Sequence, residues 1–77
     1  MHTKLSLHQL SIGESATVEK LCCNGSIHRR LLDIGLIEGT HVTCVGRSPG
    51  GDPAAYYIRG AIIAIRDDDA KKVHIIR

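Results

Sequence analysis

Apolar residues recur along the chain with two different spacings, and each spacing predicts a different kind of element. Alternation of apolar and polar residues predicts half-buried β-strands. It is present in Ser15–Leu21, in Thr40–Val45, on both sides of Gly60-Ala61 and in residues 72–77. Between these segments, Gly46–Pro53 contains three glycines, two prolines and an aspartate, which predicts a loop. The pattern as a whole predicts about five short strands.

The second spacing predicts one short helix. Ile27, Leu31 and Ile34 lie at i, i+4 and i+7 and would form a single apolar stripe. Ser26 is the expected N-terminal cap, so that the helix begins at Ile27. Gly35 stands where a left-handed C-terminal cap belongs. Because the helix is short, packing of its stripe must stabilise it.

The segment around Gly60-Ala61 predicts a β-hairpin with a definite register. If these two residues form the turn, Ile58 pairs with Ile63. The residues then separate onto two faces, with Tyr56, Ile58, Ile63 and Ile65 directed inward, and Tyr57, Arg59, Ile62 and Ala64 directed outward.

These elements predict a mainly β fold. Five short strands with one short α-helix after the first strand suit a small, strongly bent SH3-like five-stranded barrel. The 77 residues suffice for one domain, residues 1–77. Only Tyr56 and Tyr57 are aromatic, so the interior is expected to be aliphatic. Asp67 is the expected cap of one helical turn before the last strand.

Charge and cysteine content limit the possible binding partners and the cellular compartment of the protein. The net charge of +2 arises after residue 40 and is too small to indicate a nucleic-acid-binding face. Three cysteines, two of them adjacent, predict no disulfide framework. We find neither the apolar core of a signal peptide nor a run long enough to span a membrane, and we therefore expect a cytoplasmic protein without direct membrane insertion.

Four sequence blocks carry a resemblance to a known family. "RRLLDIGLIEGTHV" at residues 29–42, followed by "SPGGDP", "IRG" and "AIRDDDAKKV", resembles the FeoA family over residues 5–77. The resemblance implies an SH3-like barrel without enzymatic activity. It also implies a role beside FeoB, a membrane ferrous-iron transporter with a cytoplasmic G-protein domain. Ile62 stands where the family usually has a polar residue, so either the partner-facing surface is altered or the chain is one of several paralogues.

Enzymatic chemistry has no support in the chain. We find no nucleophile–base motif, Walker loop or dinucleotide-binding fingerprint, and therefore expect no catalytic residue and no cofactor. The glycine-rich loop Gly46–Pro53 lacks the Lys-Ser/Thr ending that a phosphate-binding loop has.

Two binding activities form an alternative reading, that of a metal-responsive or nucleic-acid-binding small barrel acting in regulation. Cys22, Cys23 and His28 are metal-ligand types close in sequence, but adjacent side chains of an extended chain point to opposite faces. We therefore predict no metal site. Adventitious surface binding of a metal through His2, His8 or His74 is easier to explain than a physiological site. For nucleic acid, only Tyr57 near Arg59 and Arg47 offers stacking beside positive charge, so no nucleic-acid partner is expected.

Protein binding fits the remaining features best. Arg29 and Arg30 lie in the first turns of the predicted helix, where the helix dipole disfavours cations unless Asp33 or a partner compensates. The outward hairpin face would expose apolar surface, unless the C-terminal segment covers it. The candidate partner-binding residues are Arg29, Arg30, Asp33, Leu36, Tyr57, Arg59 and Ile62. The sequence leaves open whether the chain forms a weak homo-oligomer.

Overall fold

The computed structural model describes residues 4–77, which form six strands and three short helical segments. The strands are β1 (Lys4–Ser6), β2 (Ser15–Leu21), β3 (His41–Arg47), β4 (Ala54–Ile58), β5 (Ala61–Ile65) and β6 (Val73–Ile76). The helical segments are the 3-10 turn η1 (Leu7–Gln9), helix α1 (Gly25–Ile34) and the single turn α2 (Asp67–Ala70).

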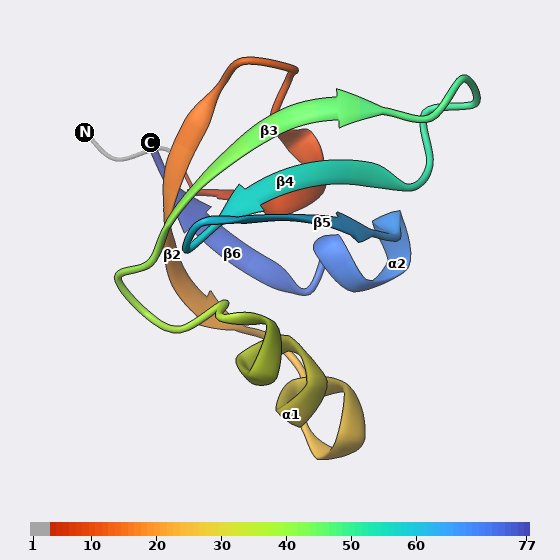
Figure 1. Ribbon diagram of the computed structural model, residues 1–77. Helices are drawn as coiled ribbons and strands as arrows, with labels where there is room; N and C mark the ends of the chain where they lie inside the picture. Colours follow the sequence, from red (N-terminus) through yellow and green to blue (C-terminus); the bar gives the residue numbers. More distant parts are fainter. Residues whose placement is uncertain (1–3) are drawn as a thin grey trace.

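All six strands belong to one antiparallel sheet in the order β1-β6-β2-β3-β4-β5. The sheet is strongly bent, and α1 lies at one end of it (Figure 1). The expected mainly β fold is therefore confirmed, and the helix, expected after the first strand, follows β2. The strand count differs, because β1 forms an additional strand against β6 through the pair Leu5 and Ile75. Its three residues are too few for alternation to be recognised.

The interior is aliphatic, as the composition predicts. Inward residues of the strands alternate with outward ones, and η1 adds the buried side chain of Leu7 to this interior. The fully buried residues with the largest side chains are Tyr56, Leu7, Leu10, Leu31, Leu36, Ile58, Ile75, Val18, Val42, Val73 and Cys44. Cys44 thus behaves as a small core residue, as we predicted. Tyr56 is the single aromatic member of this set, and its hydroxyl donates to the carbonyl of Leu7 at 3.4 Å.

Helix α1 packs through the predicted stripe. Leu31 is fully buried, and Ile27 and Ile34 pack against the core from the two ends of the helix. The predicted start is wrong by two residues, since the helix begins at Gly25 with Asn24 as its N-cap. Gly25 has a φ of 71°, which only glycine adopts easily, and this turn brings the chain from β2 into the helix before Ser26 is reached.

The C-terminal end of α1 is closed by a Schellman motif, a paired hydrogen-bond arrangement that caps helices. Gly35 adopts the predicted left-handed conformation with a φ of 113°. Its N–H donates to the carbonyl of Leu32 at 2.9 Å, and the N–H of Leu36 donates to the carbonyl of Leu31 at 3.1 Å. Leu36 therefore lies in the core beside Leu31. Because its exposed fraction is 0%, Leu36 offers no surface to a partner, and its assignment to the binding surface is wrong.

The β4–β5 hairpin turns one residue earlier than predicted. Arg59 and Gly60 form the turn with φ values of 49° and 91°, as a type I′ turn requires. The observed pairs are Ile58 with Ala61 and Tyr56 with Ile63, so the predicted pairing of Ile58 with Ile63 is wrong. Each partner moves by two positions, which preserves the face of every side chain. The predicted inward and outward sets are accordingly correct.

The hairpin turn packs directly against the cap of α1. A Cβ atom added at Gly35 would lie 3.0 Å from Cδ of Arg59 and 3.4 Å from Cγ2 of Ile58. Gly35 thus serves two purposes, the left-handed conformation and the close approach of the hairpin. The side chain of Arg59 passes the C-terminal end of α1, where the helix dipole favours a positive charge.

Replacing Gly35 with alanine tests this packing. Gly35→Ala should lower the free energy of unfolding by about 1–3 kcal/mol, because alanine is strained at this φ and its methyl group displaces Arg59. Gly39→Ala is the matched control, since Gly39 has a φ of 90° and no atom lies within 4 Å of an added Cβ. Urea unfolding of both variants measures the difference. An equal loss in the two variants would show that the contact with the hairpin contributes nothing.

The burial of Tyr56 predicts a loss of stability at high pH. Burial raises the pKa of Tyr56 from 10.0 to about 12. Because the folded-state pKa lies above the unfolded-state value, this contribution is complete below pH 10 and is lost as the pH rises towards 12. Tyr56→Phe should remove this part of the alkaline destabilisation, whereas Tyr57→Phe, at an exposed site, should retain it. Unfolding measured between pH 8 and 12, alongside tyrosinate absorbance, distinguishes the variants; identical pH profiles would contradict the assignment.

Candidate protein-binding surface

The candidate residues that remain exposed lie in two areas joined by the β4–β5 turn. Arg29 and Asp33 are exposed on α1, and Arg59 lies on the turn against the cap of that helix. Tyr57 and Ile62 lie on the outward face of the hairpin, directly opposite each other on β4 and β5. Arg59 follows Tyr57 by two residues and connects the charged area to the apolar one.

Arg30 has a partner within the molecule. Its Nη2 atom lies 2.6 Å from Oδ2 of Asp69, so the ion pair links α1 to α2. Asp33 was one expected partner for the helix arginines. In the structure, the carboxylate that pairs with Arg30 is that of Asp69, which lies 39 residues further along the chain. The side chain of Arg30 is still 58% exposed, and the pair is therefore worth little to stability.

The apolar area forms a continuous patch on the outer face of three neighbouring strands. Its members are Val45 on β3, Ala55 and Tyr57 on β4, and Ile62 and Ala64 on β5. We call these five residues the outer-face patch. The exposed fractions are 41% for Val45, 47% for Tyr57 and 67% for Ile62. Residues 66–77 therefore do not cover the patch, which was the alternative left open by the sequence.

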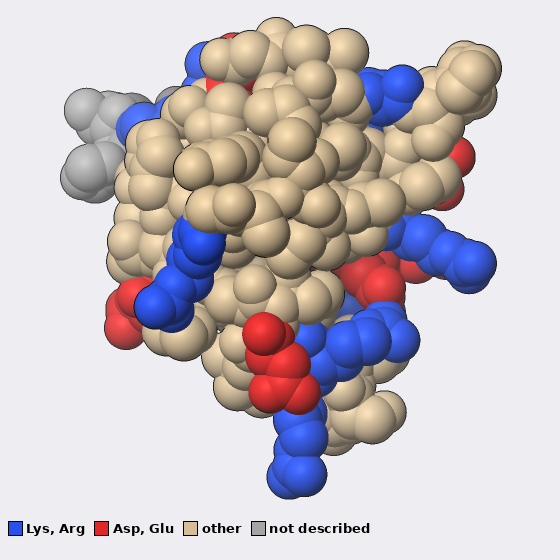
Figure 2. All heavy atoms as spheres, viewed as in Figure 1, with Lys and Arg blue, Asp and Glu red and all other residues tan. Residues whose placement is uncertain are grey.

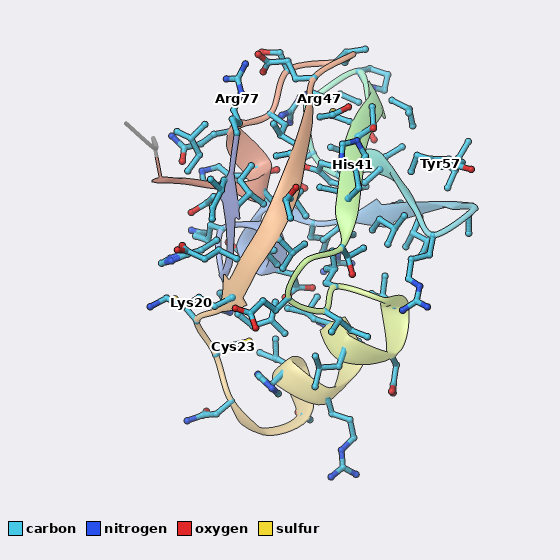
Figure 3. The ribbon with its side chains drawn as sticks, turned by 90° about the vertical axis from the view of Figure 1, so that its left-hand side faces the viewer. Lys20, Cys23, His41, Arg47, Tyr57 and Arg77 are labelled. Atoms are coloured by element: carbon cyan, nitrogen blue, oxygen red, sulfur yellow. The ribbon has the colours of Figure 1, made fainter. Side chains whose placement is uncertain are left out.

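The figures show the setting of the patch. Tyr57 projects away from the sheet (Figure 3). The face over β3 and β4 is broadly uncharged, with both basic and acidic side chains around its margin (Figure 2). An apolar centre with a charged margin is the usual anatomy of a protein-binding surface. Val45 was missed from the sequence, although its alternation with Cys44 would have placed it outward.

Arg47 is engaged inside the molecule and is not available to a nucleic acid in this conformation. Its guanidinium donates to the carbonyls of His8 at 2.8 Å, Leu10 at 2.7 Å and Gly51 at 3.2 Å. These bonds attach the end of β3 to η1, to the residue that follows η1, and to the β3–β4 loop. Of the residues proposed for a nucleic-acid site, only Tyr57 and Arg59 remain exposed, without a clustered basic face.

The cysteine and histidine side chains do not converge as a metal centre. Within residues 4–77, no three His, Cys, Asp or Glu side chains are grouped so that they could hold one metal ion. Cys23 and Cys22 instead make separate contacts: Nδ1 of His28 lies 3.0 Å from the Cys23 carbonyl, and Sγ of Cys22 lies 3.3 Å from Nδ1 of His74. The second contact joins residues 52 positions apart, which sequence spacing does not reveal.

Comparisons with known proteins place this geometry in a family. The model of the FeoA domain matches residues 5–77. A curated fusion protein of Porphyromonas gingivalis, the Fe(2+) transport protein A/Fe(2+) transporter FeoB fusion protein, is 28% identical over 71 residues. The match covers 92% of this chain and 8% of the fusion protein, so this chain spans only a small part of that relative.

Two known structures share the fold over nearly the whole chain. FeoA of Stenotrophomonas maltophilia, an SH3 domain protein crystallised with zinc, is 32% identical with a TM-score of 0.82. The match covers 92% of this chain and 88% of that one. A FeoA-like protein of Clostridium acetobutylicum is 26% identical with a TM-score of 0.88, and the match covers 100% of this chain and 88% of that one. These likenesses confirm the SH3-like fold.

No helix within residues 4–77 has the length and apolar character needed to cross a membrane. Of the four blocks that carried the sequence resemblance, the first three occupy α1 with its cap, the β3–β4 loop and the hairpin turn, and the fourth spans the end of β5, α2 and the start of β6. With the family model covering nearly every residue, the chain belongs to the FeoA domain family, whose members are non-enzymatic accessory proteins.

Proposed function

We propose that this chain is an accessory protein of bacterial ferrous-iron uptake that binds a FeoB-type membrane transporter from the cytoplasm. We further propose that this chain modulates the transporter through the transporter's cytoplasmic G-protein domain. One observation carries the proposal: the Porphyromonas gingivalis relative combines transport protein A and the FeoB transporter in one polypeptide. Domains joined in this way act at high effective concentration. A separate chain needs a binding surface to reach the same proximity.

The outer-face patch and its charged margin supply a surface of the required kind. Tyr57 is large, rigid and half-exposed, and aromatic residues of this type carry much of the binding energy of protein interfaces. Ile62 extends the apolar area on the neighbouring strand. Arg59 lies on the hairpin turn and Arg29 on α1, and exposed charges of this kind accelerate association with an acidic partner surface. Arg30 contributes less, because Asp69 already neutralises it.

Side-chain truncation in the patch should weaken binding without unfolding the protein. We expect Tyr57→Ser to raise the dissociation constant for the transporter's purified cytoplasmic domain by about tenfold or more, because a buried interface anchor is lost. Ile37→Ser is the matched control, since Ile37 is 44% exposed but lies in the α1–β3 loop. Calorimetric titration measures both, with thermal unfolding as the folding check.

The arginine substitution Arg29→Gln should act differently. It should slow association mainly at low ionic strength, because exposed charges act over a longer range when they are not screened. If the wild-type chain does not bind the cytoplasmic domain, the proposed function is wrong. If it binds and Tyr57→Ser equals Ile37→Ser, the patch is not the binding surface.

A further inference from the structure

The β5 strand has one unpaired edge. It stands last in the sheet order and pairs with β4 alone (Figure 1). In a two-residue hairpin, the residues that flank the turn form a hydrogen-bonded pair, here Ile58 and Ala61. The alternation of an antiparallel ladder then directs the N–H and C=O groups of Ile62 and Ala64 away from β4. Within residues 4–77, the backbone bonds between different elements include none from these two residues.

This edge lacks the features that usually prevent strand pairing. The sequence Ala61–Ile65 has no charged residue and no proline, and its register with β4 is continuous from end to end. Edge strands are commonly protected by lysine, proline or a bulge. The other edge strand of the sheet, β1, is only three residues long. A long, apolar and regular edge is a template for an added strand.

Space for such a strand lies beside β5. A groove of about 700 Å³ runs between α1 and the C-terminal part of β5. Leu31 and Ile34 of α1 line one wall, and Ala64 and Ile65 of β5 line the other. Leu31 and Ile65 are buried beneath the groove, so its exposed surface next to β5 is formed by Ile34, Ala64 and the charged side chains around them.

The charges in the groove favour an acidic occupant. Asp69 is neutralised by Arg30 at 2.6 Å, and Asp68 lies 3.5 Å from Nζ of Lys71. Arg66 and Lys72 also line the groove and take part in no ion pair among the described residues. A carboxylate on the added strand would find two cations that lack a partner.

We propose that an extended segment of the transporter binds by strand addition to the free edge of β5. This inference rests on the proposed function and specifies how the partner is held. The segment forms backbone hydrogen bonds with Ile62 and Ala64. Its outward side chains are apolar and continue the outer-face patch, and its groove side carries a carboxylate near Arg66 and Lys72. Strand addition accounts for the position of Ile62, which is 67% exposed, on the edge strand itself.

Amide hydrogen exchange of the wild-type chain with the transporter's cytoplasmic domain gives the direct test. In the complex, the amides of Ile62 and Ala64 should exchange at least about tenfold more slowly, because both N–H groups become hydrogen-bonded. The same amides should be unaffected by raising the concentration of the chain alone. Slowing with concentration would mean that a second copy occupies the edge, which would overturn the proposal.

A proline substitution isolates the backbone contribution. Ala64→Pro removes an N–H that faces solvent and leaves the bonds to β4 intact, as proline at an edge strand allows. It should raise the dissociation constant by about tenfold. Ala64→Ser is the matched comparison, because it changes the side chain at the same position but keeps the N–H, so the difference in dissociation constant between the two variants measures the backbone contribution. If Ala64→Pro does not fold, the exchange measurement on the wild type decides.

The outcomes separate this inference from the proposed function. Binding with slowed exchange at Ile62 and Ala64 supports strand addition. Binding with unchanged exchange at both amides overturns strand addition and leaves the proposed function standing. Absence of wild-type binding overturns both.

Discussion

The contact between Gly35 and the β4–β5 turn is the constraint on which the rest of the structure depends. The Schellman motif ends α1, directs Leu36 into the core and leaves space for the aliphatic part of Arg59. Because the hairpin is held at this point, its inward face covers the core and its outward face presents Tyr57 and Ile62. Gly35, which has no side chain and adopts a left-handed conformation, therefore couples α1 to the hairpin that carries the candidate binding surface.

The sequence was a reliable guide wherever a repeat determines which side of an element is buried. Alternation identified the inward residues of β2 and β3, and the helical stripe identified Leu31. It could not determine the hairpin register, because turns at Arg59-Gly60 and at Gly60-Ala61 give the same alternation. Packing of Arg59 against Gly35 distinguishes the two possible turns, and the two residues of this contact are 24 positions apart in the sequence.

The candidate surface was only partly predictable for the same reason. The outward positions of Tyr57 and Ile62 follow from the alternation alone, but whether each arginine is paired or exposed depends on long-range contacts. Arg30 meets Asp69 and Arg47 meets the carbonyls of His8 and Leu10, and no local pattern signals either arrangement. Leu36 belongs to the block that carries the family resemblance, but the structure shows it completing the helix cap in the core. A motif can thus mark a requirement of the fold rather than a contact.

The pairing of β1 with β6 joins the first described residues of the domain to its last, as Leu5 opposite Ile75 illustrates. During synthesis, the first strand to leave the ribosome therefore has no partner until the final strand has emerged. The two Arg47 bonds to the carbonyls of His8 and Leu10 need only residues that are synthesised before β6, so they can hold this segment near the growing sheet in the meantime. Completion of the sheet is consequently a late event, in keeping with the slow folding of domains whose contacts are distant in sequence. A nascent chain of this protein exposes the inner face of its sheet until translation of the domain is complete.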